Sequence, residues 1–83
     1  MSRKRKRIDG EIYYLARMLK SVPCSVDLPG GLRISAQFNP GEVVLVLAED
    51  VEDGGPFFYA IQDGQPYSAI LREKDFRLLG EVE

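Results

Sequence analysis

Apolar residues from position 24 onward occur in short runs that turn residues separate. Residues 32–38 show the clearest pattern, because apolar side chains at the even positions alternate with polar ones at the odd positions. This two-residue period is typical of a strand with one solvated face. Residues 43–48 are apolar throughout, which indicates a central strand. Further short runs predict strands at residues 24–28, 57–62, 67–71 and 77–82.

Glycine, proline, asparagine and aspartate mark the breaks between these strands. Such clusters fall at residues 29–31, 39–41 and 53–56. Asp63-Gly64 is a favoured pair for a hairpin turn of type I′, which requires a positive φ at both residues. Residues 73–76 are typical of a single helical turn. Short strands with frequent turns predict a mainly β fold, a small five-stranded barrel.

In residues 8–19 the apolar side chains recur with a longer period than the two-residue period of a strand. They lie at positions 8, 12, 15, 16 and 19, the spacing of one face of an α-helix. Asp9 suits the N-cap of such a helix, and Pro23 disfavours helical dihedral angles in the residue before it. We therefore expect one α-helix ahead of the barrel.

Five consecutive cations precede that segment. They are Arg3, Lys4, Arg5, Lys6 and Arg7. A run of like charges with no apolar neighbour repels itself and buries no surface. The pattern predicts a flexible basic arm over residues 1–7 and a single domain of helix and barrel over residues 8–83.

The stretch from residue 37 to residue 79 resembles the barrel of Src-homology-three domains in the order of its features. "FNPGEVVLVL" resembles the turn into the family's second strand, "EDGGPFFYAIQDGQ" its acidic loop and distal hairpin, and "LREKDFRLL" its helical turn. The resemblance implies the barrel architecture. The family's polyproline groove needs aromatic residues, yet Phe57 stands at its tryptophan position, and Arg72 and Asp75 replace its proline and tyrosine. These departures argue against a polyproline ligand.

Catalytic chemistry finds little support in the composition. The chain has no histidine and one cysteine, so the commonest general base, an intrachain disulfide and an ordinary zinc site are absent. Cys24 follows the expected helix and lies in an expected strand, which favours a buried structural thiol over a reactive one. The glycines match no phosphate-binding motif. We therefore expect a protein that is not an enzyme and that uses no cofactor or metal.

Charge divides the chain into two parts of opposite sign. Residues 1–20 hold seven basic and two acidic side chains, whereas residues 21–83 hold four and eleven. Such polarity concerns association rather than fold. Residues 3–7 are candidates for binding nucleic acid or an acidic protein surface, since neutralising phosphates releases counterions.

The rest of the chain offers acidic and aromatic candidates for a protein-binding face. They are Glu49, Asp50, Glu52, Asp53, Phe57, Tyr59 and Tyr67. For the four acids, a hard-cation site or the carboxyl pair of a glycosidase is the alternative to a solvated loop, and the loop is favoured because no calcium-loop spacing occurs. For the aromatics, a stacking platform or a cation-binding cage is the alternative to packing inside the barrel and covering its outside, and packing is favoured.

The preferred hypothesis is an interaction module that binds a protein partner through this face. Nucleic-acid association through the arm is the runner-up, although eleven acids repel a duplex. A homo-oligomer, with the arm of one chain on the acidic face of another, is the third. With no long apolar run and one cysteine, we expect an intracellular, cytoplasmic protein without membrane association.

Overall fold

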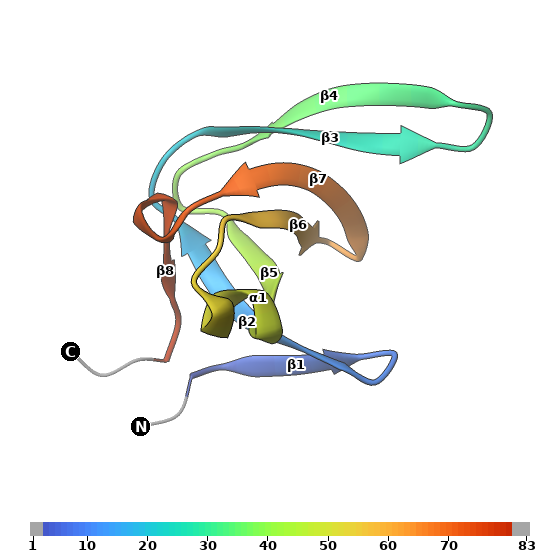
Figure 1. Ribbon diagram of the computed structural model, residues 1–83. Helices are drawn as coiled ribbons and strands as arrows, with labels where there is room; N and C mark the ends of the chain where they lie inside the picture. The colour runs from blue at the N-terminus through green and yellow to red at the C-terminus, as the bar shows by residue number, and fades with distance from the viewer. Residues whose placement is uncertain (1–2, 81–83) are drawn as a thin grey trace.

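The computed structural model describes residues 3–80, apart from the side chains of Phe57 and Phe58. Within these residues the chain forms eight antiparallel strands, one short helix and one turn of 3₁₀ helix (Figure 1). The strands are β1 (Arg5–Ile8), β2 (Glu11–Met18), β3 (Val22–Leu28), β4 (Leu32–Phe38), β5 (Val43–Leu47), β6 (Phe57–Gln62), β7 (Gln65–Leu71) and β8 (Phe76–Leu78). The helix is α1 (Ala48–Asp53), and the 3₁₀ turn is η1 (Glu73–Asp75). The mainly β class is confirmed.

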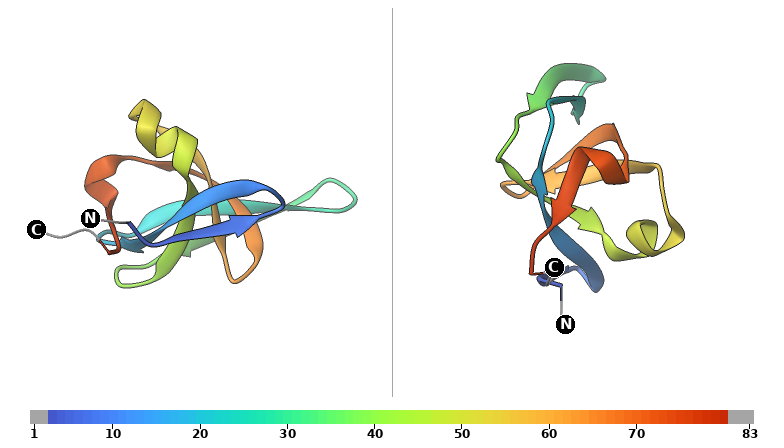
Figure 2. Two further views of the ribbon diagram at one scale, coloured as in Figure 1. Left: turned by 90° about the horizontal axis from the view of Figure 1, so that it is seen from below. Right: turned by 90° about the vertical axis from the view of Figure 1, so that its left-hand side faces the viewer.

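The strands form one curved sheet in the order β1-β2-β5-β6-β7-β3-β4 (Figures 1 and 2). β2 shares one of its edges between two strands, because β1 pairs with its first half and β8 with its second half. No pairing among residues 3–80 joins the two ends of this order, so the sheet is not closed. The closed five-stranded barrel expected from the sequence is therefore not confirmed.

The expected N-terminal helix over residues 8–19 is wrong, since this segment lies in a β-hairpin. Asp9 (φ 49°) and Gly10 (φ 83°) form the turn between β1 and β2 instead of capping a helix. Positions 12, 14, 16 and 18 are also apolar and form a row with the period of a strand. β2 pairs on both sides, with β5 on one edge and with β1 and β8 on the other. This tertiary pairing outweighs the helical spacing, because local propensity is a weak preference.

The basic segment expected as a flexible arm contributes strand β1. Arg5 lies opposite Tyr14, and Arg7 lies opposite Ile12. The backbone N–H of Lys4 donates to the carbonyl of Leu79 at 3.0 Å. The structure thus places the two ends of the described chain beside each other (Figure 1).

The core lies on the concave side of the sheet and consists mainly of every second residue of the paired strands. Its buried members are Tyr14, Ala16, Met18, Val22, Cys24, Phe38, Val44, Val46, Ala48, Ala60, Ala69, Leu71 and Phe76. The expectation that β5 is a central strand is confirmed, because it pairs with both β2 and β6. Val44 and Val46 are its core side chains, whereas Leu45 and Leu47 are half-buried on the other face.

Truncating Val46 to alanine is expected to cost more stability than truncating Leu45, although leucine is the larger side chain. Val46 is fully buried, and each buried methyl group contributes about 0.8 kcal/mol, with a further cost for the cavity. We expect Val46→Ala to lower the free energy of unfolding by about 1 kcal/mol more than Leu45→Ala, measured by urea denaturation. The reverse order would contradict the orientation of β5.

The remaining strand predictions agree closely with the structure. β4 and β6 match the predicted ranges, and η1 lies within the predicted helical turn. The expected type I′ turn is confirmed, because Asp63 (φ 53°) and Gly64 (φ 77°) both have positive φ. The expected last strand, residues 77–82, extends beyond the described residues, which end β8 at Leu78.

Candidate functional site

The convex face of β2, β5 and β6 presents apolar side chains that the chain itself covers only in part. Residues directly opposite each other in an antiparallel pair share a face. Tyr13 lies opposite Leu47, and Leu45 lies between Leu15 and Ile61. All five side chains are half-buried. We call this surface, made by Tyr13, Leu15, Leu45, Leu47 and Ile61, the outer face.

A hollow of about 240 Å³ lies on the outer face beside α1. Its lining residues come from β2, β5, α1, β6 and β7, and they are Tyr13, Leu47, Asp50, Tyr59, Ala60, Ile61 and Pro66. Tyr59 is 66% exposed, so its ring stands at the surface. The hollow thus combines two tyrosine side chains, one carboxylate and aliphatic surface.

Helix α1 divides the predicted acidic cluster between two sides. The expected solvated loop is instead a short helix that ends at Gly54, whose N–H donates to the carbonyl of Val51 at 3.2 Å. Asp50 lines the hollow beside Tyr59. Glu49 and Glu52 border another depression with Ile12 and Gly10 of the first hairpin. The four acids therefore do not act on one surface.

The other predicted members of this group occupy different positions. The Tyr14 hydroxyl donates to Glu52 Oε2 at 3.5 Å. Asp53 is exposed at the end of α1, and the side chain of Phe57 lies outside the described part of the structure. Tyr67 points inward and packs edge-on against Phe38, with ring centroids 5.4 Å apart and an interplanar angle of 72°. Of the seven predicted residues, Asp50 and Tyr59 are the two that line this hollow.

The five cations at the N-terminus are also divided between two faces. Arg5 shares the concave side with Tyr14, whereas Lys6 lies opposite Tyr13 and shares the outer face. The guanidinium carbon of Arg3 lies 5.2 Å from the centroid of the Tyr14 ring, a cation–π contact. Alternation places Arg7 with Arg5 and Lys4 with Lys6. The segment is therefore not a single basic surface.

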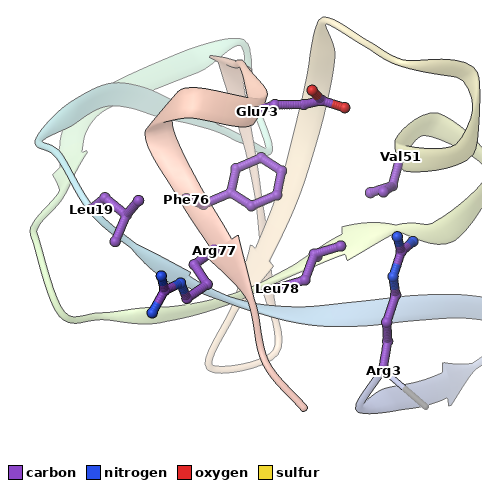
Figure 3. Close-up of a pocket in the computed structure, with 7 residues that line it drawn as sticks. All are labelled: Arg3, Leu19, Val51, Glu73, Phe76, Arg77 and Leu78. Atoms are coloured by element: carbon purple, nitrogen blue, oxygen red, sulfur yellow. The ribbon is translucent and has the colours of Figure 1, made fainter. Parts of the chain in front are cut away.

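A larger hollow, of about 390 Å³, lies on the concave side beside β8 (Figure 3). Arg3 reaches toward Val51 from one side, while Phe76 and Leu78 point into the hollow from β8 (Figure 3). Glu73 stands at its upper rim. Phe76 belongs to the buried core, and Val51 and Leu78 pack against that core. This hollow is the open side of the sheet rather than a cleft on the outer face.

Cys24 and Glu42 both have shifted pKa values. Burial raises the pKa of the Cys24 thiol, so the inert neutral form is favoured. The backbone N–H of Asn39 and the side-chain amide of Gln62 donate to Glu42 and lower the pKa of its carboxyl. The ionised Glu42 thereby links the turn before β5 to the end of β6. Residues 3–80 contain no cluster of three metal-ligating side chains.

Sequence reasoning missed most of the residues that form the hollow. Tyr13 falls within the expected helix over residues 8–19, Leu47 and Ile61 fall in expected strands whose faces the pattern does not specify, and Pro66 lies outside every expected strand. The strand period of β2 was the signal that identifies Tyr13, because positions 11, 13, 15 and 17 alternate with the core row.

In the described range, α1 and η1 are too short to cross a bilayer.

The chain matches no protein-family model, and no curated protein or solved structure proved similar to it.

Proposed function

We propose that this chain is a non-enzymatic interaction module that binds a basic segment of a partner protein on its outer face. The observation that carries the proposal is the hollow that Tyr13, Asp50 and Tyr59 line together, although they come from three different elements. The aliphatic side chains of Leu47 and Ile61 form its apolar part.

The chemistry of this hollow favours an arginine or lysine side chain. A cation near a tyrosine ring gains about 0.5–2 kcal/mol, depending on desolvation, and a carboxylate adds a charge-assisted hydrogen bond. The aliphatic stem of such a side chain packs against leucine and isoleucine while its head reaches the acid. A hollow of about 240 Å³ is smaller than the usual pocket for a drug-sized ligand, roughly 300–1,000 Å³, and suits a single side chain.

The architecture that we propose for the module is an open form of the Src-homology-three barrel. The meander β5-β6-β7, the turn η1 and the short β8 follow one another in the order that the resemblance implies. β8 returns to pair with β2, as a closing strand does. The residues of the family's polyproline groove are not matched, which is why a basic rather than a proline-rich partner is proposed.

Binding of two labelled peptides tests this function. The first is an octapeptide of alternating arginine and leucine, and the second has glutamate in place of arginine. We expect the arginine peptide alone to bind, and we expect Asp50→Asn and Tyr59→Ala each to weaken it about 10-fold, equivalent to about 1.4 kcal/mol. Fluorescence anisotropy gives the affinities.

Asp53→Asn is the matched control, because Asp53 lies on the same helix, is exposed and does not line the hollow. It is expected to leave the affinity nearly unchanged. Equal losses for Asp50→Asn and Asp53→Asn would show general charge attraction and contradict the proposal. Tighter binding of a twenty-nucleotide single-stranded DNA than of the arginine peptide would favour nucleic-acid association through residues 3–7.

A further inference from the structure

The hairpin of β3 and β4 extends beyond the rest of the sheet (Figures 1 and 2). β3 pairs with β7 only at Cys24 and Ser25, so the outer half of the hairpin has no third strand in the described chain. There Val26 lies opposite Ile34, and Leu28 lies opposite Leu32. Leu32 is 65% exposed and Ile34 is 49% exposed. These four residues form an apolar face outside the core.

β4 also presents a free edge. Among residues 3–80 it pairs with β3 alone, and it stands at one end of the strand order. Unpaired backbone groups along a strand edge are a template for another strand, and proteins commonly block such edges with charged residues. An accessible strand edge beside an apolar face can therefore form backbone hydrogen bonds with a strand of another chain.

The two edge strands of the sheet, β1 and β4, differ in how many charged residues they carry. β1 carries Arg5, Lys6 and Arg7 in succession, so two copies of that edge repel each other. β4 carries one charged residue, Arg33, and Arg33 donates to both carboxylate oxygens of Asp27, at 2.8 Å and 3.4 Å. Arg33 lowers the pKa of Asp27, so this pair stays ionised and neutral overall at pH 7. The edge of β4 is therefore free of net charge.

We propose that two copies of this chain pair antiparallel along β4, about a two-fold axis at Ser35. This register sets Arg33 opposite Gln37 of the partner subunit, so like charges do not face each other. It sets Ile34 opposite Ala36 of the partner subunit, which joins the apolar faces of the two hairpins. An isologous contact of this kind closes on itself, and the edges that remain at the two ends of the joined sheet are the charged β1 strands.

Because the same edge pairs with itself about the two-fold axis, a second copy of this chain is favoured over an unrelated peptide as the occupant of the edge. One symmetry operation pairs both neutral edges and sets the two apolar faces side by side, and each Arg33 keeps its own Asp27. A seven-residue strand makes a small interface, and small interfaces are weak. We therefore expect a dimer that dissociates on dilution.

Two opposite substitutions of Gln37 test the register. Gln37 is exposed, so neither change disturbs the core. Gln37→Glu sets a carboxylate opposite the second copy's guanidinium at both ends of the contact, and we expect the dimer dissociation constant to fall about 5-fold. Gln37→Arg sets like charges there, and we expect it to rise about 5-fold. Sedimentation velocity from micromolar to millimolar protein measures both constants.

Ile34→Lys provides a second measurement, because it places a charge on the shared apolar face, and we expect it to abolish dimerisation. Far-ultraviolet circular dichroism verifies that each variant is folded. A wild-type chain that stays at the mass of one copy up to millimolar concentration would overturn the proposal. So would a dimer that responds in the same direction to Gln37→Glu and Gln37→Arg, or one that Ile34→Lys leaves intact.

Discussion

Phe38→Ala is expected to remove a large part of the stability of this protein. Phe38 is the last residue of β4 and lies opposite Val22 at the base of the long hairpin. Its side chain has no exposed surface. Its ring also packs edge-on against Tyr67. Truncating a buried phenylalanine costs about 3–5 kcal/mol, and a domain of this size has about 4–12 kcal/mol in total.

Thermal unfolding followed by circular dichroism measures this effect. A loss of that size corresponds to a fall in melting temperature of at least about 12 °C for a domain of this length. Ser35→Ala is the control, because Ser35 is exposed on the same strand, and we expect its melting temperature to change little. A fall of less than about 4 °C for Phe38→Ala would contradict the core described above.

Gly64→Val is expected to destabilise the protein through the backbone alone. Gly64 has a φ of 77°, and a Cβ atom there would meet no atom within 4 Å, so the expected penalty comes from the backbone conformation rather than from a clash with neighbours. A β-branched residue is strained in this region, at a cost of about 1–3 kcal/mol. The turn also sets the register of β6 against β7. Urea denaturation gives the loss.

The adjacent turn residue supplies the matched control for this prediction. Asp63 has a φ of 53°, and asparagine adopts positive φ as readily as aspartate. We expect Asp63→Asn to leave the free energy of unfolding within about 0.5 kcal/mol of the wild type. If Gly64→Val were equally harmless, the type I′ turn would be wrong.

The strands after residue 22 were predictable because their signals are local. Alternation in β4 and the continuous apolar run of β5 specify a strand without knowledge of its partners. The Asp63-Gly64 pair specifies a turn for the same reason, since positive φ suits these residue types. The order of strands in the sheet follows from none of these signals.

The N-terminal segment shows where local signals conflict. Asp9-Gly10 is the same dipeptide as Asp63-Gly64 and makes the same kind of turn, with positive φ at both residues. The helical spacing of the following apolar residues led to its interpretation as a helix cap. Both periods fit residues 12–18, and the choice depended on whether neighbouring strands were present to pair with them.

For the candidate site, the sequence predicted the types of side chain involved but not which of them lie together. An acidic and aromatic surface was expected, and Asp50 and Tyr59 belong to the hollow. Tyr13 lies more than 40 positions before Tyr59, and nothing local connects the two. Their common position results from β5, which pairs with β2 on one edge and with β6 on the other.

The sequence by itself determined the strand-rich class, the turns and the alternation that separates a core side from a surface side. It also determined that the chain has no histidine and cannot form an intrachain disulfide. Tertiary structure alone decided that residues 11–18 form a strand, that the sheet stays open, and that β4 ends it with a neutral edge. The physical reason is that side-chain periods and turn preferences act over a few residues, whereas hydrogen bonds between strands join residues far apart in the chain, and those bonds select among conformations that local preferences leave nearly equal.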